Sequence, residues 1–161
     1  MKNSILIIIL SLISITQALA CSCVEENISL GRKVKAEFQS SDLVFTGKVI
    51  DIIDNETGET TFSGYPLIYI FEVVQTFKGK SETKIIEVVS ARESASCGYK
   101  FNLGETYLVY SINSDFYNSY TRNNSDFITS LCDRNKPFAT TEKREIRKLE
   151  RLSKHTNWNI T

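Results

Sequence analysis

The chain has 161 residues, 19 Lys and Arg against 19 Asp and Glu, a hydrophobic share of 42% and four Cys. This length fits one ordinary domain, and the near-average composition disfavours disordered, collagen-like and coiled-coil proteins. The balanced charge gives no electrostatic argument for binding nucleic acid or an anionic membrane surface. The single His, His155, argues against a His-rich metal site and a Ser-His-Asp hydrolase.

The N-terminus has the three parts of a secretory signal peptide. Lys2 precedes the apolar run 5–15, and the small residues Ala18 and Ala20 flank Leu19 at a cleavage site. The apolar run is short for a transmembrane span, so an uncleaved anchor is the less favoured alternative. We expect a signal peptide at 1–20 and one domain at 21–161, secreted to the extracellular space or periplasm without a transmembrane segment. Loss of Lys2 gives the mature chain a formal side-chain charge of −1 (18 − 19).

Cleavage after Ala20 makes Cys21 the first residue of the mature chain. Small residues before a Cys also occur where a lipoprotein is processed and acylated on that Cys, although Ala18 stands where such a signal usually has Leu. Two hypotheses follow, a free Cys21 amine and a membrane-anchored lipoprotein acylated on Cys21.

The four Cys predict two disulfides, because an exported protein meets an oxidising environment. A bridge between Cys21 and Cys23 would close a small, strained ring. Two pairings remain, and each ties Cys21 and Cys23 to Cys97 and Cys132. A zinc site made of the four Cys is the alternative, but the Cys-x-Cys spacing is tighter than usual and the other two Cys form no local pair. Either disulfide pattern would hold the mature N-terminus against the domain.

Helical periodicity occurs near both ends of the mature chain, at 29–38 and 141–154. Ser29 is a suitable N-cap for the first helix. Each segment repeats apolar residues on one face: Leu30, Val34 and Phe38 in the first, and Ile146, Leu149 and Leu152 in the second.

Five segments rich in β-branched and aromatic residues predict strands at 43–53, 67–76, 84–90, 106–112 and 127–132. Polar stretches at 54–60 and 113–126 predict loops. The apolar side of the first strand changes near Gly47, which predicts a bulge there. Five strands with a helix at each end indicate an all-β fold, a closed or partly open OB-like barrel, since a sandwich needs more strands. The aromatic residues expected in its core are Phe45, Tyr69, Phe71, Tyr107 and Tyr110.

Three segments together resemble the tissue inhibitors of metalloproteinases. Cys21-Ser22-Cys23-Val24 resembles their Cys-x-Cys start, residues 41–49 resemble the first strand of netrin-like modules, and Glu93-Ser94-Ala95-Ser96-Cys97-Gly98-Tyr99 resembles their Glu-Ser…Cys-Gly-Tyr segment. Residues 104–110 and Cys132 followed by a helix also fit. The resemblance covers about 21–152. It implies a netrin-like OB barrel with disulfides Cys21–Cys97 and Cys23–Cys132.

The chain also departs from this family. It lacks the third disulfide of the animal inhibitors and their Cys-rich C-terminal domain, and it has Glu25 and Glu26 where they tend to have prolines. It is therefore similar to the short single-domain members. Because netrin-like folds also serve as interaction modules, the alternative is a non-inhibitory domain that recruits a protein or polysaccharide, with a binding face on 113–126.

The resemblance implies a monomeric, non-enzymatic inhibitor of zinc metalloproteases that needs no cofactor of its own. The amine and carbonyl of Cys21 would chelate the protease's catalytic zinc, while Ser22 would enter a specificity pocket and Cys23 and Val24 would continue along the cleft. Residues Glu93, Ser94, Ala95 and Ser96 would make a second protease contact, and the loop 55–60 would touch the rim. Four Asn-x-Ser/Thr sites are candidates for glycosylation: Asn27, Asn55, Asn123 and Asn159.

Overall fold

A computed structural model describes residues 21–24, 27–54, 65–80, 83–121 and 123–158. The expected signal peptide, the loop 55–60 with Asn55, and Asn159 lie outside the described residues. Within them, the helices are α2 (Leu30–Ser40), α3 (Asn118–Thr121) and α4 (Lys143–Trp158). The strands are β1 (Leu43–Asp54), β2 (Leu67–Lys78), β3 (Ile85–Ser90), β4 (Thr106–Ser114), β5 (Asp126–Thr129) and β6 (Lys136–Pro137), with short 3-10 turns η1 (Ser94–Ser96) and η2 (Phe138–Thr140).

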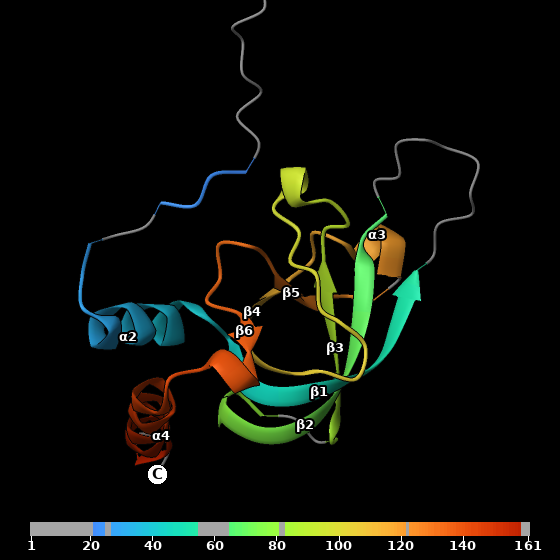
Figure 1. The fold of residues 1–161 in the computed structure, drawn as a ribbon. Helices are drawn as coiled ribbons and strands as arrows, with labels where there is room; N and C mark the ends of the chain where they lie inside the picture. The colour runs from blue at the N-terminus through green and yellow to red at the C-terminus, as the bar shows by residue number, and fades with distance from the viewer. Residues whose placement is uncertain (1–20, 25–26, 55–64, 81–82, 122, 159–161) are drawn as a thin grey trace, which may run out of the picture.

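Five of these strands form a closed barrel (Figure 1). The strand order is β1-β2-β3-β5-β4, and pairing of β1 with β4 closes the circle. The β3–β5 pair is parallel, and the other four pairs of the barrel are antiparallel. The predicted OB-like barrel with flanking helices is confirmed, and the two-residue strand β6 pairs with β4 at Tyr107 and Leu108.

The first strand bends as predicted, but its apolar side changes later than expected. Pairing of β1 with β2 shifts register between Thr46 and Gly47, where an added Cβ would lie 2.8 Å from the Phe45 ring. Two further shifts occur, and the one between Val49 and Asp51 leaves Ile50 without a partner in β2. Val49 before it is fully buried, Ile50 is 43% exposed and Ile52 packs on the barrel core. The change of face therefore falls at Ile50, because the extra residue there rotates the following side chains by one position.

Two apolar layers hold the fold together. Four of the five predicted aromatic core residues, Phe45, Tyr69, Phe71 and Tyr107, lie inside the barrel. Tyr110 lies in a second layer, where α2 and α4 cover the outside of the barrel. This layer contains the predicted helix stripes, with Val34, Phe38 and Leu149 buried and Leu30, Ile146 and Leu152 packed against them.

A buried carboxylate fastens α4 to the barrel. Glu145 is fully buried, with Lys136 Nζ at 2.8 Å and an Arg134 guanidinium nitrogen at 3.2 Å. The Tyr110 hydroxyl donates to the same carboxylate at 3.2 Å. Burial and the neighbouring Glu145 charge raise the pKa of Tyr110, so its hydroxyl stays a donor. With three donors, Glu145 avoids the penalty of an unpaired buried charge.

The region 113–126 is more ordered than the predicted loop. It holds the end of β4, the short helix α3 and the first residue of β5. The last barrel strand ends at Thr129 rather than at the predicted 132, because the Ser130 backbone N–H donates to the Asp133 carboxylate at 2.6 Å and the chain turns there.

Candidate functional site

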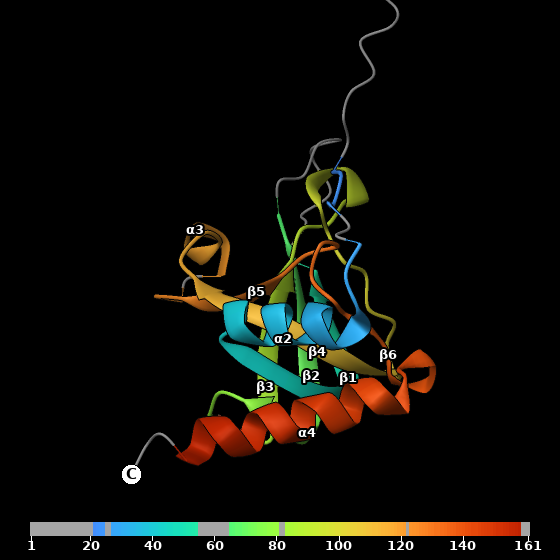
Figure 2. The ribbon, with the colours of Figure 1, turned by 90° about the vertical axis from the view of Figure 1, so that its left-hand side faces the viewer.

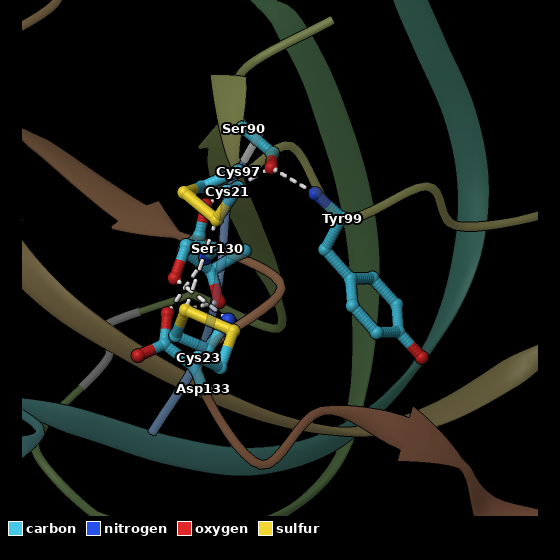
Figure 3. Close-up of a disulfide and its surroundings, with 9 residues drawn as sticks. Cys21, Cys23, Ser90, Cys97, Tyr99, Ser130 and Asp133 are labelled. Carbon is cyan, nitrogen blue, oxygen red and sulfur yellow. Dashed lines mark hydrogen bonds between the residues drawn. A yellow bond between two sulfur atoms is a disulfide. The ribbon is translucent and has the colours of Figure 1, made fainter. Parts of the chain in front are cut away.

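Two disulfides tie residues 21–23 to the barrel (Figure 3). Cys21 is bonded to Cys97 and Cys23 to Cys132, with 5.1 Å between the Cα atoms of each pair. This is the pairing that the family resemblance implies. The sulfurs of Cys21, Cys23 and Cys132 lie within 4.8 Å of one another, but all four Cys are in disulfides and offer no thiolate to a metal. The alternative of a zinc site built from the four Cys does not fit this arrangement.

The bridges place residues 21–24 at one end of the barrel. Cys97 lies between β3 and β4, and Cys132 lies between β5 and β6, so the first three residues of the predicted mature chain connect two neighbouring loops. In both ribbon views this end of the barrel lies opposite α4 (Figures 1 and 2). The two disulfides fix this segment against the barrel.

The loop that carries Cys97 has a tightly fixed backbone. The backbone N–H groups of Ser96 and Gly98 both donate to the Glu93 carbonyl, at 3.0 and 2.9 Å. Cys97 has a left-handed φ of 62°. A Cβ on Gly98 would lie 1.9 Å from the carbonyl oxygen of Ala91, so glycine is required where these segments pass. The hydrogen bonds to Glu93 and the close approach of Gly98 to Ala91 fix the orientation of the turn Ser94–Ser96.

The two segments expected at the site lie side by side. The Cys21 backbone nitrogen donates to the Ala95 carbonyl at 3.4 Å, in addition to the disulfide. Val24 is 93% exposed. The side chains of Ser22, Cys23, Glu93, Ser94, Ala95 and Ser96 are also exposed, and Cys21 is half-buried. We call residues 21–24 and 93–96 the N-terminal ridge.

A hydrogen-bond network under the ridge joins the loops that anchor it. The hydroxyl of the fully buried Ser90 donates to the Thr129 carbonyl at 2.9 Å and accepts the Tyr99 N–H at 2.8 Å (Figure 3). The Leu131 N–H donates to the Cys97 carbonyl at 2.8 Å. These hydrogen bonds therefore connect the two loops that carry Cys97 and Cys132. Sequence reasoning did not identify Ser90, because a single Ser at the end of a predicted strand carries no distinctive pattern.

A pair of partly buried carboxyl groups supports the Cys132 side. Asp133 accepts the Ser130 N–H, and burial raises the pKa of its carboxyl. Burial and the nearby Asp133 charge raise the pKa of Glu37, on α2, to about 7, while Arg134 opposes this shift. The loop holding Cys132 therefore meets α2 at two carboxyl groups whose pKa values are both raised by burial.

A mostly apolar hollow of about 290 Å³ adjoins the ridge. Ser96 and Cys97 of the ridge loop form one wall, and Ile112, Phe116 and Ile128 contribute apolar surface. Phe116 is 71% exposed, and its ring packs edge-on against Tyr117 with centroids 4.8 Å apart. The region 113–126, predicted as the binding face of a non-inhibitory domain, thus carries exposed aromatic surface next to the ridge.

Neither a protein-family model nor a curated protein matches the chain. Across the part of the chain that the structure describes, no helix is long and apolar enough to span a bilayer. Two disulfides are typical of proteins that fold in an oxidising compartment.

Proposed function

We propose that this protein is a secreted inhibitor of zinc metalloproteases, a single-domain form similar to the tissue inhibitors of metalloproteinases. In this proposal residues 1–20 are removed and Cys21 carries the free α-amine. The observation that carries the proposal is the position of Cys21, which is tied by its disulfide and by the Ala95 contact into an exposed ridge at one end of the barrel.

The chemistry of a terminal Cys21 suits a metal that belongs to another protein. Its α-amine and its own carbonyl oxygen are separated by two carbon atoms, so both can bind one ion in a five-membered ring. A catalytic zinc keeps one coordination position for the water that attacks the substrate. A chelating pair displaces that water. An α-amine has an ordinary pKa of ~7.7–8, so losing its proton to bind zinc is inexpensive near neutral pH.

The remaining ridge residues provide the surface that a protease cleft requires. Ser22 follows the chelating residue directly and its small exposed side chain would enter the adjacent specificity pocket. Cys23 and Val24 would continue along the cleft. The exposed turn 93–96 would contact the opposite wall, and the apolar hollow beside Ser96 would accept an apolar side chain from the protease rim.

The disulfides favour binding because they order the ridge before the protease arrives. An interface segment that is already fixed loses little conformational entropy on association. In the ridge, both Cys residues of the terminal segment are bonded, and the facing turn is held by three backbone hydrogen bonds, Ser96 and Gly98 to Glu93 and Cys97 to Ser94.

The disulfides argue against the lipoprotein alternative. Acylation consumes the Cys21 thiol, which would leave Cys97 without the partner it has in this fold. The exposed aromatic surface around Phe116 is the observation that favours the other alternative, a non-inhibitory binding domain. Acylation would block the Cys21 amine, and a non-inhibitory domain would not use it.

A pair of proteins that differ by one residue tests the proposal. One begins at Cys21, and the other carries one extra Ala before it, which moves the amine away and turns the Cys21 nitrogen into an amide. Intact mass must first show two disulfides and no lipid in both. We expect the first to inhibit at least one protease in a panel of matrix-type and thermolysin-type zinc enzymes, and the extended form to inhibit at least about 100-fold less. Equal inhibition by the two forms would refute chelation.

A further inference from the structure

The two disulfides of the N-terminal ridge lie next to each other (Figure 3). The Cys21 sulfur, bonded to Cys97, lies 3.9 Å from the Cys132 sulfur, which is bonded to Cys23. The sulfurs of Cys21, Cys23 and Cys132 all lie within 4.8 Å of one another. A thiolate formed at Cys132 would therefore stand beside the Cys21–Cys97 bridge, and thiol–disulfide exchange begins from such a neighbouring thiolate.

The length of chain between the Cys residues does not select the observed pairing. The observed bridges span 76 and 109 residues. The other pairing, Cys21–Cys132 with Cys23–Cys97, would span 111 and 74 (97 − 23) residues. In the chain-entropy model the stabilisation depends on the logarithm of these lengths, so the two pairings restrict the unfolded chain almost equally. The preference between them therefore depends on contacts in the folded protein.

The terminal segment makes few contacts that favour the observed pairing. Among the described residues, the one backbone hydrogen bond recorded for 21–24 joins the Cys21 N–H to the Ala95 carbonyl, and at 3.4 Å it is long. The side chains of 22–24 are exposed. The loops that carry Cys97 and Cys132 are joined more closely, by the hydrogen bond of 2.8 Å from Leu131 to Cys97. Without its bridges, the terminal segment would therefore be free to turn between two fixed loops.

We propose that these four Cys form a disulfide-exchange site, at which a small thiol converts the observed pairing into Cys21–Cys132 with Cys23–Cys97. The Cys23–Cys132 bridge is the point of entry, because both of its residues are exposed, whereas Cys21 and Cys97 are half-buried. Attack on Cys132 would release Cys23, and a bond from Cys23 to Cys21 would close a strained ring. Attack on Cys23 releases Cys132 and is the productive reaction.

The exchange consists of three substitutions at sulfur. The thiolate of the small thiol bonds to the Cys23 sulfur, and the Cys23–Cys132 bond breaks with its electron pair on Cys132. The Cys132 thiolate then bonds to the Cys21 sulfur, 3.9 Å away, and displaces the Cys97 thiolate. Cys97 finally bonds to the Cys23 sulfur and releases the small thiol as its thiolate. Two disulfides are present before and after, so the thiol is a catalyst and no oxidant or reductant is consumed.

The two pairings place the terminal segment differently. In the exchanged form Cys21 is attached to the loop between β5 and β6, and Cys23 takes its place beside the turn 93–96. One consequence rests on the proposed function: the exchange would move the Cys21 amine away from that turn and weaken inhibition. The exchange itself does not depend on inhibition, and it is tested without a protease.

Glutathione and S-methylglutathione form a matched pair of probes, because the second lacks the thiol. The folded mature chain is incubated with each at about pH 8, where thiolates form, then acidified, blocked with N-ethylmaleimide and digested with trypsin. Cys97 and Cys132 lie on separate tryptic peptides, 93–100 and 123–134, and fragmentation between Cys21 and Cys23 shows which peptide each one holds. With glutathione, we expect the Cys21–Cys132 bridge in at least about a tenth of the molecules.

Cys23→Ser tests the central substitution alone, because it leaves the Cys21–Cys97 bridge with a Cys132 thiol beside it. In the folded variant, whose cooperative melting is checked first, N-ethylmaleimide should label both Cys97 and Cys132. The same variant in urea is the control, where loops of 76 and 111 residues predict about twofold more label on Cys132 than on Cys97. If the variant does not melt cooperatively, the parent chain alone decides.

Three results would overturn the proposal. The first is a parent chain that forms no Cys21–Cys132 bridge in glutathione. The second is a folded Cys23→Ser protein that is labelled on Cys132 alone. The third is equal exchange in S-methylglutathione, which would show that no thiol takes part.

Discussion

Removing one disulfide at a time tests how the terminus is anchored. Taken alone, the Cys21–Cys97 bridge closes a loop of 76 residues and the Cys23–Cys132 bridge one of 109. In the chain-entropy model these loops correspond to about 4.5 and 4.8 kcal/mol of stabilisation at 25 °C. The two bridges share their N-terminal end, however, because Cys21 and Cys23 are two residues apart.

That shared end changes the expected magnitude. When one bridge is present, the other closes a loop of only about 37 residues, the 35 from Cys97 to Cys132 and the two from Cys21 to Cys23. The same model then gives about 3.8 kcal/mol for either bridge. We expect Cys21→Ser with Cys97→Ser, and Cys23→Ser with Cys132→Ser, to lose similar amounts of unfolding free energy. Removing both bridges should cost about 8–9 kcal/mol, which is comparable to the whole stability of many domains.

Urea unfolding of the mature chain measures these values, from the midpoint and slope of each transition. The two single-bridge variants should agree within about 1 kcal/mol, and the variant without bridges should be largely unfolded at 25 °C. If the loss of unfolding free energy on removing both bridges equalled the sum of the two single losses, the shared-loop reasoning would be refuted. A loss below about 1 kcal/mol for either bridge would show that the terminus is not held as the structure indicates.

Two further predictions concern the supports of the ridge. Gly98→Ala should lower the free energy of unfolding by about 1–3 kcal/mol and weaken inhibition, because the added methyl group would clash with the Ala91 carbonyl. The control Gly31→Ala should be neutral or stabilising, because nothing lies within 4 Å of the added Cβ in α2. Equal losses of the two variants in urea unfolding would contradict the close approach of Gly98 to Ala91. The raised pKa of Glu37 means that its native-state carboxyl holds its proton more tightly, so this group reduces stability as pH rises from 4.5 to 7. Glu37→Gln should therefore stabilise by about 1 kcal/mol at pH 8 and by little at pH 4, and urea midpoints that shift equally at both pH values would exclude this titration.

The sequence predicted those parts of the fold that depend on local patterns. The helix stripes of Val34 and Leu149 and the aromatic positions of the strands are buried as expected, since each follows a simple period that one face of an element must satisfy. Closure of the barrel followed from the number of strands. The register was harder to predict: the unpaired Ile50 depends on how β1 meets β2, which no local pattern specifies.

The candidate site was predictable to a similar extent. The Cys pattern predicted that Cys21 and Cys23 are bonded to Cys97 and Cys132, but the choice between the two possible pairings came from the family resemblance. Ser90, which supports the ridge, and the buried Glu145 bond to Thr129 and Tyr110, which lie on distant segments of the chain. Asp133 bonds to Ser130 within its own loop.

The most direct test of the proposed function observes the protease's metal itself. A target zinc protease is loaded with cobalt, whose visible spectrum reports a change of ligands, and is mixed with the chain that begins at Cys21 or with the form extended by one Ala. We predict that the first shifts the cobalt bands as water is replaced by the amine and carbonyl, and that the extended form leaves them unchanged. An unchanged spectrum in a complex of the first form with the protease would contradict the account, as would the same shift with both forms.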